Sequence, residues 1–290
     1  MTGAVGRIRA AFTDAGVTGR LHALDIDSGA ELDAGGKGVV ATASVHKLCL
    51  LVALHERAAA GQLDLTEQVE CPPGGRTAGP TGLAAMLDPV RMSVRDLAYL
   101  MIAVSDNAAA DLLLDRVGLD AVNATTARLG LTATRMTRTF AGLLATMKED
   151  TGPLGAQALT DPHVLSRLRA LDPGHSNHST PRDLTRLLRA IWRDEAGTPE
   201  HCAAIRRLLG LQVWPHRMAS GFPFDDVHVA GKTGTLPTAR SEVGVVEYPD
   251  GGRYAVAVFT RAANPAATLP QADAVIGTAA RLAVDALRLQ

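Results

Sequence analysis

The segment ASVHKLCLLVAL, residues 43–54, places a serine and a lysine at the start of an apolar run. On a helix, positions i and i+3 share one face, so Lys47 can direct its amine toward the Ser44 hydroxyl. An amine in apolar surroundings loses proton affinity and can accept the serine proton, which creates a nucleophile. The same spacing also occurs in an ordinary helix with a polar first turn and a lysine along its surface. The pattern therefore predicts an acylatable serine only if other motifs support it.

Two further triplets supply that support. The sequence SDN, residues 105–107, follows the apolar segment 97–104, and KTG, residues 232–234, lies in a predicted strand. The order Ser-x-x-Lys, Ser-Asp-Asn, Lys-Thr-Gly, in helix, loop and strand contexts, is the signature of serine β-lactamases and penicillin-binding proteins. The chain resembles the class A-like branch of that superfamily over most of its length.

The resemblance implies a role for each motif residue. Ser44 would be the nucleophile, and Lys47 would accept or relay its proton. Ser105 would pass a proton to the leaving nitrogen. Asn107 would hydrogen-bond the substrate amide or hold Lys47, and a role as a helix cap stays open. Lys232 would stabilise charge near Ser105 and attract a substrate carboxylate.

The strand that carries KTG would complete the site. The hydroxyls of Thr233 and Thr235 would contact the substrate carboxylate, and the Thr235 N–H would join the Ser44 N–H in an oxyanion hole. Gly234 would leave the room that a close-approaching substrate needs. Asp106 is expected to cap the next helix. Three arginines are candidates for binding an anionic group, although surface solvation is the alternative for each: Arg217, Arg240 and Arg261.

The pattern of predicted elements indicates an α+β fold. Predicted strands and terminal helices occupy both ends of the chain, while residues 44–210 read as mostly helical. This arrangement predicts one antiparallel sheet built from both chain ends, and the resemblance implies five strands with terminal helices and an inserted helical lobe. We expect a sheet lobe of residues 1–43 and 211–290 and a helical lobe of residues 44–210. Together they would form a single folding unit with the active site between the lobes.

Composition narrows the classes of partner. The formal net charge of the 290 residues is -1, which leaves no nucleic-acid footprint. No apolar run is long enough to span a membrane, and the start of the chain lacks the apolar core of a signal peptide. We therefore expect a cytoplasmic protein, or a secreted one if the N-terminus has been trimmed. The expected partner is a small molecule that carries a carboxylate, and the oligomeric state is left open.

The cysteines show no metal-binding spacing, and the sequence calls for no metal or cofactor. Cys49 lies in the apolar run and is expected in the core, whereas Cys71, before two prolines, is expected in an exposed loop.

One part of the family pattern is missing. Class A β-lactamases carry a glutamate, on a loop before a Thr-Pro helix start, that activates the water for deacylation. Thr180 and Pro181 mark that helix here, but no Glu-x-x-x-Asn pattern precedes them, and the nearest upstream glutamate is Glu149. The groups near this loop that could activate water are Asp161, His163, Asp172, His175 and His178.

These observations predict a serine hydrolase that acts on an amide, lactam or ester through a Ser44 acyl-enzyme. We hypothesise that its natural substrate is not a penicillin, since the water-activating glutamate is absent. Three alternatives stay open: a β-lactamase with another deacylation base, a penicillin-binding-protein-like peptidase or acyltransferase, and a covalent binding or sensing module with little turnover.

Overall fold

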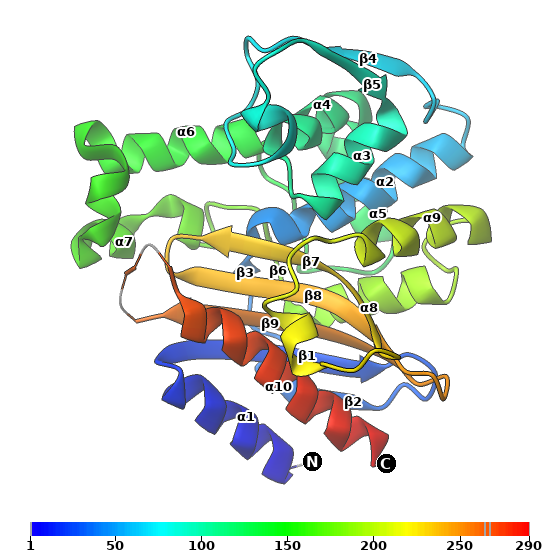
Figure 1. The fold of residues 1–290 in the computed structure, drawn as a ribbon, viewed down its shortest axis with the longest axis vertical. Helices are drawn as coiled ribbons and strands as arrows, with labels where there is room; N and C mark the ends of the chain where they lie inside the picture. Colours follow the sequence, from blue (N-terminus) through cyan, green and yellow to red (C-terminus); the bar gives the residue numbers. More distant parts are fainter. Residues whose placement is uncertain (1, 264, 267, 290) are drawn as a thin grey trace.

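A five-stranded antiparallel sheet drawn from both ends of the chain forms the base of the structure (Figure 1). The computed structural model describes residues 2–263, 265–266 and 268–289. The strand order is β2-β1-β9-β8-β7. The strands are β1 (Val17–Asp25), β2 (Glu31–Ala34), β7 (His228–Leu236), β8 (Ala239–Glu247) and β9 (Arg253–Ala262). Strand β7, which carries the Lys-Thr-Gly motif, is therefore an edge strand.

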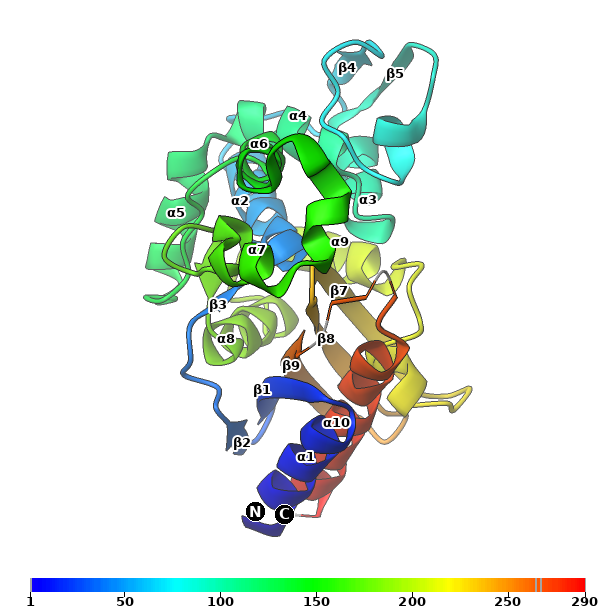
Figure 2. The ribbon, with the colours of Figure 1, turned by 90° about the vertical axis from the view of Figure 1, so that its left-hand side faces the viewer.

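The two terminal helices cover one face of this sheet. Helices α1 (Thr2–Asp14) and α10 (Pro270–Arg288) lie side by side in both ribbon views (Figures 1 and 2). Their apolar side chains, such as Ile8 and Ile276, are fully buried against strand residues such as Val256. The opposite face packs against α8 (Pro181–Trp192), whose Thr185 hydroxyl lies 2.7 Å from His22 Nδ1 of β1. The predicted fold class is confirmed.

The chain between β2 and β7 forms the helical lobe and its connections. In chain order its elements are β3 (Val40–Ala41), η1 (Ala43–His46), α2 (Lys47–Ala59), β4 (Gln68–Cys71), η2 (Gly82–Ala85), β5 (Val90–Ser93), α3 (Val94–Ala103), α4 (Asn107–Val117), α5 (Leu119–Arg128), α6 (Phe140–Thr151), η3 (Gly152–Thr160), α7 (Pro162–Arg167), η4 (Arg169–Leu171), β6 (His178–Ser179), α8, α9 (Pro199–Gly210) and η5 (Met218–Gly221). Every side chain from Lys47 to His55 is buried, so α2 is the central helix of this lobe.

Several helix starts follow from capping side chains. Ser93 accepts a hydrogen bond from Asp96 N, Thr180 from Asp183 N and Thr198 from His201 N. These caps satisfy N–H groups that have no partner within the helix. The sequence also predicts Asp120 as the N-cap of α5, and this is wrong, because Gly118 is the N-cap and Asp120 lies within the first turn.

Two predictions about the region around α2 also need correction. Ser44 does not sit in the first turn of an α-helix; it lies in the 3₁₀ turn η1, and α2 begins at Lys47. Cys71 is not exposed, because it ends β4 with only 2% of its surface accessible. Cys49 is buried as expected, and burial raises the pKa of its thiol to about 12.

The segment that the sequence pattern left unassigned, residues 136–179, contains an arm of helices. Helix α6 leads away from the lobe, η3 turns the chain, and α7 leads back toward the sheet (Figure 1). No helix among the described residues is long and apolar enough to cross a membrane.

Candidate active site

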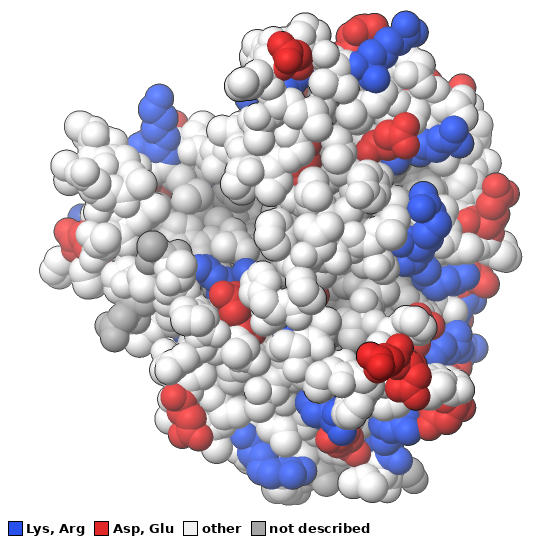
Figure 3. Space-filling view, viewed as in Figure 1, with Lys and Arg blue, Asp and Glu red and all other residues white. Residues whose placement is uncertain are grey.

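The three motifs meet at one cavity of about 380 Å³ between the helical lobe and the edge strand β7. Its lining comprises Ser44, Pro80, Thr81, Val104, Ser105, Asn107, Trp214, His216, Arg217, Thr233 and Thr235. Figure 3 looks onto this face and shows a hollow between the two parts of the molecule. Chain segments more than 180 residues apart in sequence therefore contribute side chains to one enclosed space.

Backbone geometry presents Ser44 to this cavity. Ala43, immediately before it, has a φ of 49°, a left-handed conformation that costs a non-glycine residue free energy. Thr42 anchors the turn on its other side, since its hydroxyl donates to Asn177 O at 2.8 Å. His46, two residues after Ser44, is fully buried, and burial lowers the pKa of its imidazole to about 3. Buried contacts on both sides of Ser44, made by Thr42 and His46, thus hold the strained turn.

Lys47 is fully buried and bound to the Ser-Asp-Asn loop rather than to Ser44. Its Nζ donates to Ser105 O at 2.6 Å and to Asn107 Oδ1 at 2.7 Å. Burial, helped by the nearby Lys232 charge and opposed by Asp106, holds the pKa of this amine well below its usual value. A neutral amine has two N–H donors, and these two acceptors occupy both. The remaining lone pair is then free to accept a proton.

The face of Lys47 toward the helical arm is covered by an aromatic ring. Its Nζ lies 4.7 Å from the centroid of Phe140, the first residue of α6. Phe140 is 3% exposed, and its backbone N–H donates to Asp111 Oδ1 at 2.8 Å. The sequence reasoning did not find Phe140. The capping pattern of Thr139, which accepts from Gly142 N, would have located the start of this helix.

Ser105 links the two lysines. Its φ of 62° is left-handed, which turns its carbonyl toward Lys47. Its Oγ accepts a hydrogen bond from Lys232 Nζ at 3.0 Å and lies 3.5 Å from Lys47 Nζ. A proton can therefore pass between either amine and this hydroxyl over hydrogen-bonding distances.

The other two residues of this motif have structural contacts. Asp106 is the N-cap of α4, as expected, and accepts from the N–H groups of Ala108 and Ala109. Asn107 holds Lys47 through Oδ1, and its Nδ2 donates to Ala78 O at 3.0 Å. Asn107 lines the cavity, and its Nδ2 carries a second N–H beside the one that donates to Ala78 O, so the amide can still donate to a substrate.

Lys232 is fully buried beside a buried carboxylate. Burial lowers the pKa of its amine to about 7, with Glu242 on β8 opposing this shift. The Glu242 carboxylate accepts from Gln212 Nε2 and from Met218 N, both at 2.7 Å. Gln212 Oε1 in turn accepts from Thr233 N at 2.7 Å. This network attaches the segment after α9 to the free edge of β7.

Arg217 is the arginine that reaches the cavity. It is 4% exposed, and its Nη2 donates to Thr235 Oγ1 at 2.9 Å. Its Nε donates to Asp273 of α10 at 2.6 Å. Close packing of glycines supports this segment, because a Cβ on Gly277 would lie 2.5 Å from Arg217 O. The guanidinium is thereby held against the hydroxyl that would contact a carboxylate.

The other two candidate arginines lie elsewhere. Arg240 lies within β8, not in the loop before it, and its Nη1 donates to Leu236 O and Ala239 O. Its Nε is 3.5 Å from Asp273, on the α10 side of the sheet. Arg240 and Arg261 both line a different cavity.

Gly234 packs closely against the turn that carries Ser44. A Cβ at this position would lie 2.5 Å from Ser241 Oγ, 2.8 Å from Thr42 O and 3.0 Å from Val45 Cγ2. The missing side chain therefore makes room for the turn that carries Ser44, and its predicted role toward substrate stays a prediction.

No group proposed for water activation lines the Ser44 cavity. Asp161 caps α7, and Asp172 pairs with His175 on the exposed surface at 2.8 Å. The other two candidates are His163, which is exposed, and His178, which pairs β6 with β3. Instead, the arm contributes apolar side chains, including Leu143 and Leu168, to a cluster with Ala43. Among the described residues, the cavity lining contains no aspartate or glutamate.

The described residues form no group of three or more His, Cys, Asp and Glu side chains that could hold a metal ion.

Trp214 and His216 also line the Ser44 cavity, and their rings pack edge to face with centroids 6.3 Å apart. No motif marks either residue in the sequence.

The fold and the three converging motifs define a serine β-lactamase-like protein. A sequence profile of the beta-lactamase enzyme family matches residues 4–287, and the chain belongs to this family. It is 35% identical to the beta-lactamase regulatory protein BlaB of Streptomyces cacaoi, over 97% of this chain and 96% of that protein.

Solved structures agree with the fold. A β-lactamase from Sphaerobacter thermophilus has a TM-score of 0.81 and 27% identity, covering 100% of this chain and 98% of its own. PBP-A has a TM-score of 0.80 and 22% identity, covering 100% and 97%. The chain is therefore a hydrolase-family protein with the class A β-lactamase fold.

Proposed function

We propose that this protein reacts with small carboxylate-bearing amides, lactams or esters through a Ser44 acyl-enzyme that is hydrolysed slowly. One observation carries the proposal: two buried lysines converge on Ser105 beside Ser44, in a cavity whose described lining has no carboxylate. The same arrangement supplies the groups for acylation and omits the group that would activate water.

The acylation step uses these groups in sequence. Ser44 Oγ attacks the substrate carbonyl carbon, and its proton moves to the neutral Lys47 Nζ. The bond from that carbon to the leaving nitrogen or oxygen then breaks. The leaving atom takes a proton from Ser105 Oγ, and Lys47 returns its own proton to Ser105 across 3.5 Å. The N–H groups of Ser44 and Thr235 would stabilise the negative oxygen of the intermediate.

Recognition of the substrate carboxylate falls to the opposite side of the cavity. Arg217 is held by Asp273 and donates to Thr235 Oγ1, so this hydroxyl can donate its own hydrogen to an anion. Protonated Lys232 adds positive charge in the same region. Charge-assisted hydrogen bonds of this kind are about twice as strong as neutral ones.

Slow deacylation follows from what surrounds Lys47. General-base activation of water contributes typically about 10²–10⁴-fold to a hydrolysis rate. Phe140 covers Lys47 on the side of the arm, where its ring can neither hydrogen-bond nor accept a proton. The acyl-enzyme would then wait for a water that no carboxylate of the described lining can activate.

A covalent sensor is the second candidate function. The 35% identical relative is named a beta-lactamase regulatory protein, and a long-lived adduct would suit a signal better than rapid turnover. Both candidate functions begin with acylation of Ser44, and they differ in what then happens to the acyl-enzyme.

Mass spectrometry of the intact protein tests the proposal. After mixing with a penicillin or a chromogenic cephalosporin, we expect one adduct per chain and a colour burst of about one equivalent. Ser44→Ala should form no adduct while its circular dichroism spectrum stays unchanged. Rapid, continuing colour release without an adduct would contradict slow deacylation. If neither an adduct nor colour appears, the substrate must lie outside the β-lactams.

A small alcohol or amine added to the adduct separates the two candidates. Accelerated release, with the acyl group found on the acceptor, would identify an acyl-transfer enzyme. An adduct that persists for hours with every acceptor would favour the sensor.

A further inference from the structure

A second cavity, of about 550 Å³, lies at the end of the sheet where β1 begins and β9 ends. Figure 2 looks onto this end, with β1 and β9 below α7. The cavity shares none of its lining residues with the Ser44 cavity, although Ala43 and Gly234 form part of its wall. It is therefore a separate space behind the turn that carries Ser44. Its volume is within the range of small-molecule sites.

Three exposed arginines from three elements surround this cavity. They are Arg9 of α1, Arg20 of β1 and Arg261 of β9. Within the described part of the chain none of them forms an ion pair, and the lining contains no aspartate or glutamate. Arg240 also borders the space, but its Nε faces Asp273. The cavity consequently carries positive charge without a counter-charge of its own.

The sheet register places two of these arginines close together. Arg20 pairs with Phe259, and Thr18 pairs with Arg261, so all four side chains share one face. Arg20 and Arg261 are thus diagonal neighbours, about 7–8 Å apart at the backbone. Two positive side chains on neighbouring positions repel each other, and an anion that both contact would offset this repulsion. Guanidinium groups suit this task because they present several donors in a planar fork.

The interior of the cavity is apolar. Phe259, Leu236 and Leu171 are nearly buried beneath the arginines, and Val40 is half-buried. An inorganic anion would leave these side chains uncovered, and an uncharged apolar molecule would leave the arginines unpaired. The combination fits a molecule with an apolar body and one anionic group.

We propose that this cavity binds a small organic anion with an apolar body, bearing a carboxylate, sulfonate or phosphate group. The anionic group contacts Arg20 and Arg261, and the apolar body lies on Phe259. Arg9 adds charge from α1. This binding is independent of acylation, because the site uses no residue of the Ser44 cavity.

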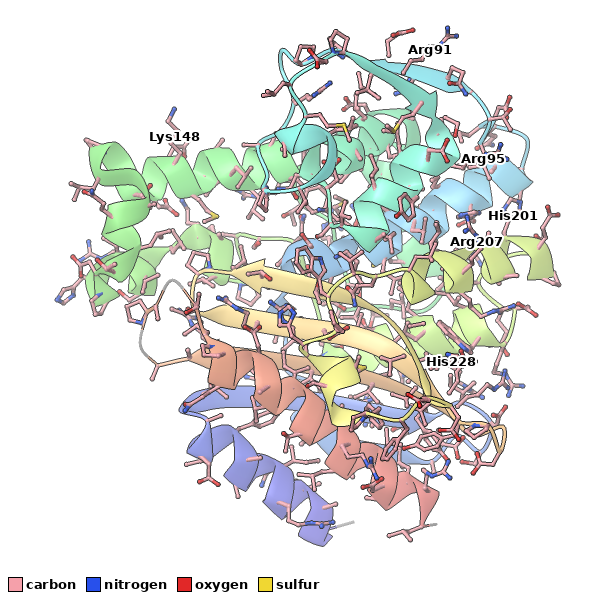
Figure 4. All side chains as sticks on the ribbon, viewed as in Figure 1. Arg91, Arg95, Lys148, His201, Arg207 and His228 are labelled. Carbon is pink, nitrogen blue, oxygen red and sulfur yellow. The ribbon has the colours of Figure 1, made fainter. Side chains whose placement is uncertain are left out.

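Two fluorescent probes of nearly the same shape test both halves of the proposal. 8-Anilinonaphthalene-1-sulfonate carries the negative charge, and N-phenyl-1-naphthylamine lacks it. We expect saturable binding of the sulfonate to the folded protein. The double variant Arg20→Gln, Arg261→Gln should weaken its binding at least tenfold while leaving binding of the uncharged probe within twofold. Arg207→Gln, an exposed arginine at the far edge of the molecule in Figure 4, is the matched control and should change neither.

A blocking variant and competitors complete the test. Thr18→Trp fills the cavity from an exposed strand position and should abolish binding of both probes there. Displacement by decanoate or by decyl phosphate tells a carboxylate site from a phosphate site. Equal weakening in Arg207→Gln, or full binding in both the double variant and Thr18→Trp, would overturn the proposal. Ser44→Ala should bind the sulfonate normally, so this outcome is separate from that of the acylation test.

Discussion

At the scale of single residues, two side chains decide the chemistry expected of this site. Phe140 covers one side of Lys47 with a ring centroid 4.7 Å from Nζ. Lys232, on the other side of Ser105, has a pKa of about 7 because it is buried. In the proposed mechanism, Phe140 would set the lifetime of the acyl-enzyme, and Lys232 would set how the charge of the cavity varies with pH.

Replacing Phe140 with glutamate should speed deacylation. The change places a carboxylate beside Lys47, where it can activate water, and we expect a 10- to 100-fold shorter adduct lifetime. Phe140→Gln introduces a side chain of the same size as glutamate but without a carboxylate. It should leave the adduct lifetime within about threefold of that of the parent protein. The measurement is the decay of the penicillin adduct by mass spectrometry. Equal lifetimes in the two variants would refute the role given to this position.

The pH dependence of acylation should report Lys232. Since its pKa in the free protein is about 7, the amine is charged below this pH and neutral above it. Acylation by an anionic penicillin should therefore fall about tenfold between pH 6 and pH 9, where one charge contact is lost. A neutral thioester substrate should show no such fall. Stopped-flow acylation rates at a series of pH values check this, and parallel profiles for both substrates would contradict it.

At the scale of elements, the contact between β7 and the turn η1 positions Ser44. The turn can approach the strand only because residue 234 is glycine, with Thr42 O and Ser241 Oγ filling the space. This contact joins the five-stranded sheet to the helical lobe beside Ser44.

Gly234→Ala should therefore lower both stability and acylation. The added methyl would lie 2.8 Å from the Thr42 carbonyl, and relief of that overlap must displace backbone. We expect a loss of about 1–3 kcal/mol in the free energy of unfolding, together with a slower reaction of Ser44. Urea denaturation and adduct kinetics measure the two effects. Gly210→Ala, where nothing lies within 4 Å, is the control and should be neutral or slightly stabilising.

At the scale of the whole molecule, buried histidines tie stability to pH. His55 of α2 and His201 of α9 lie with their Nδ1 atoms 2.9 Å apart (Figure 4 shows His201 on α9 at the edge of the lobe). Burial and the neighbouring His201 lower the pKa of His55 to about 4. Burial likewise lowers the pKa of the His46 imidazole to about 3.

The sign of the effect follows from these lowered values. Between pH 6.5 and pH 4 the unfolded chain binds protons that folded His55 does not, so stability is present above pH 6.5 and is lost as pH falls. For His55 the loss at pH 5 is about 2 kcal/mol. Urea titrations should show that the free energy of unfolding of His55→Leu falls by about 2 kcal/mol less than that of the parent protein between pH 8 and pH 5. His163→Gln, at an exposed histidine, should leave the dependence unchanged; a slope unaltered in His55→Leu would disprove the assignment.

Local patterns in the chain were sufficient to predict the fold class, the order of motifs and the apolar central helix. Such features depend on neighbours in sequence: helical spacing, caps such as Thr180, and strands of alternating or apolar residues. The three motifs predicted which residues the structure brings to one cavity. The structure places Ser44, Ser105 and Thr233 in the lining of that cavity, and each motif has its own helix, loop or strand context in the sequence.

Contacts between distant segments decided the rest. The ring of Phe140 over Lys47, the α10 support of Arg217 through Asp273, and the orientation of Arg240 away from the site all depend on packing. No short pattern encodes them, because each joins side chains from separate elements. The sequence by itself thus determined the fold and predicted an acylatable serine; only the tertiary structure decided what surrounds that serine, since burial and electrostatic environment arise from the whole packed molecule.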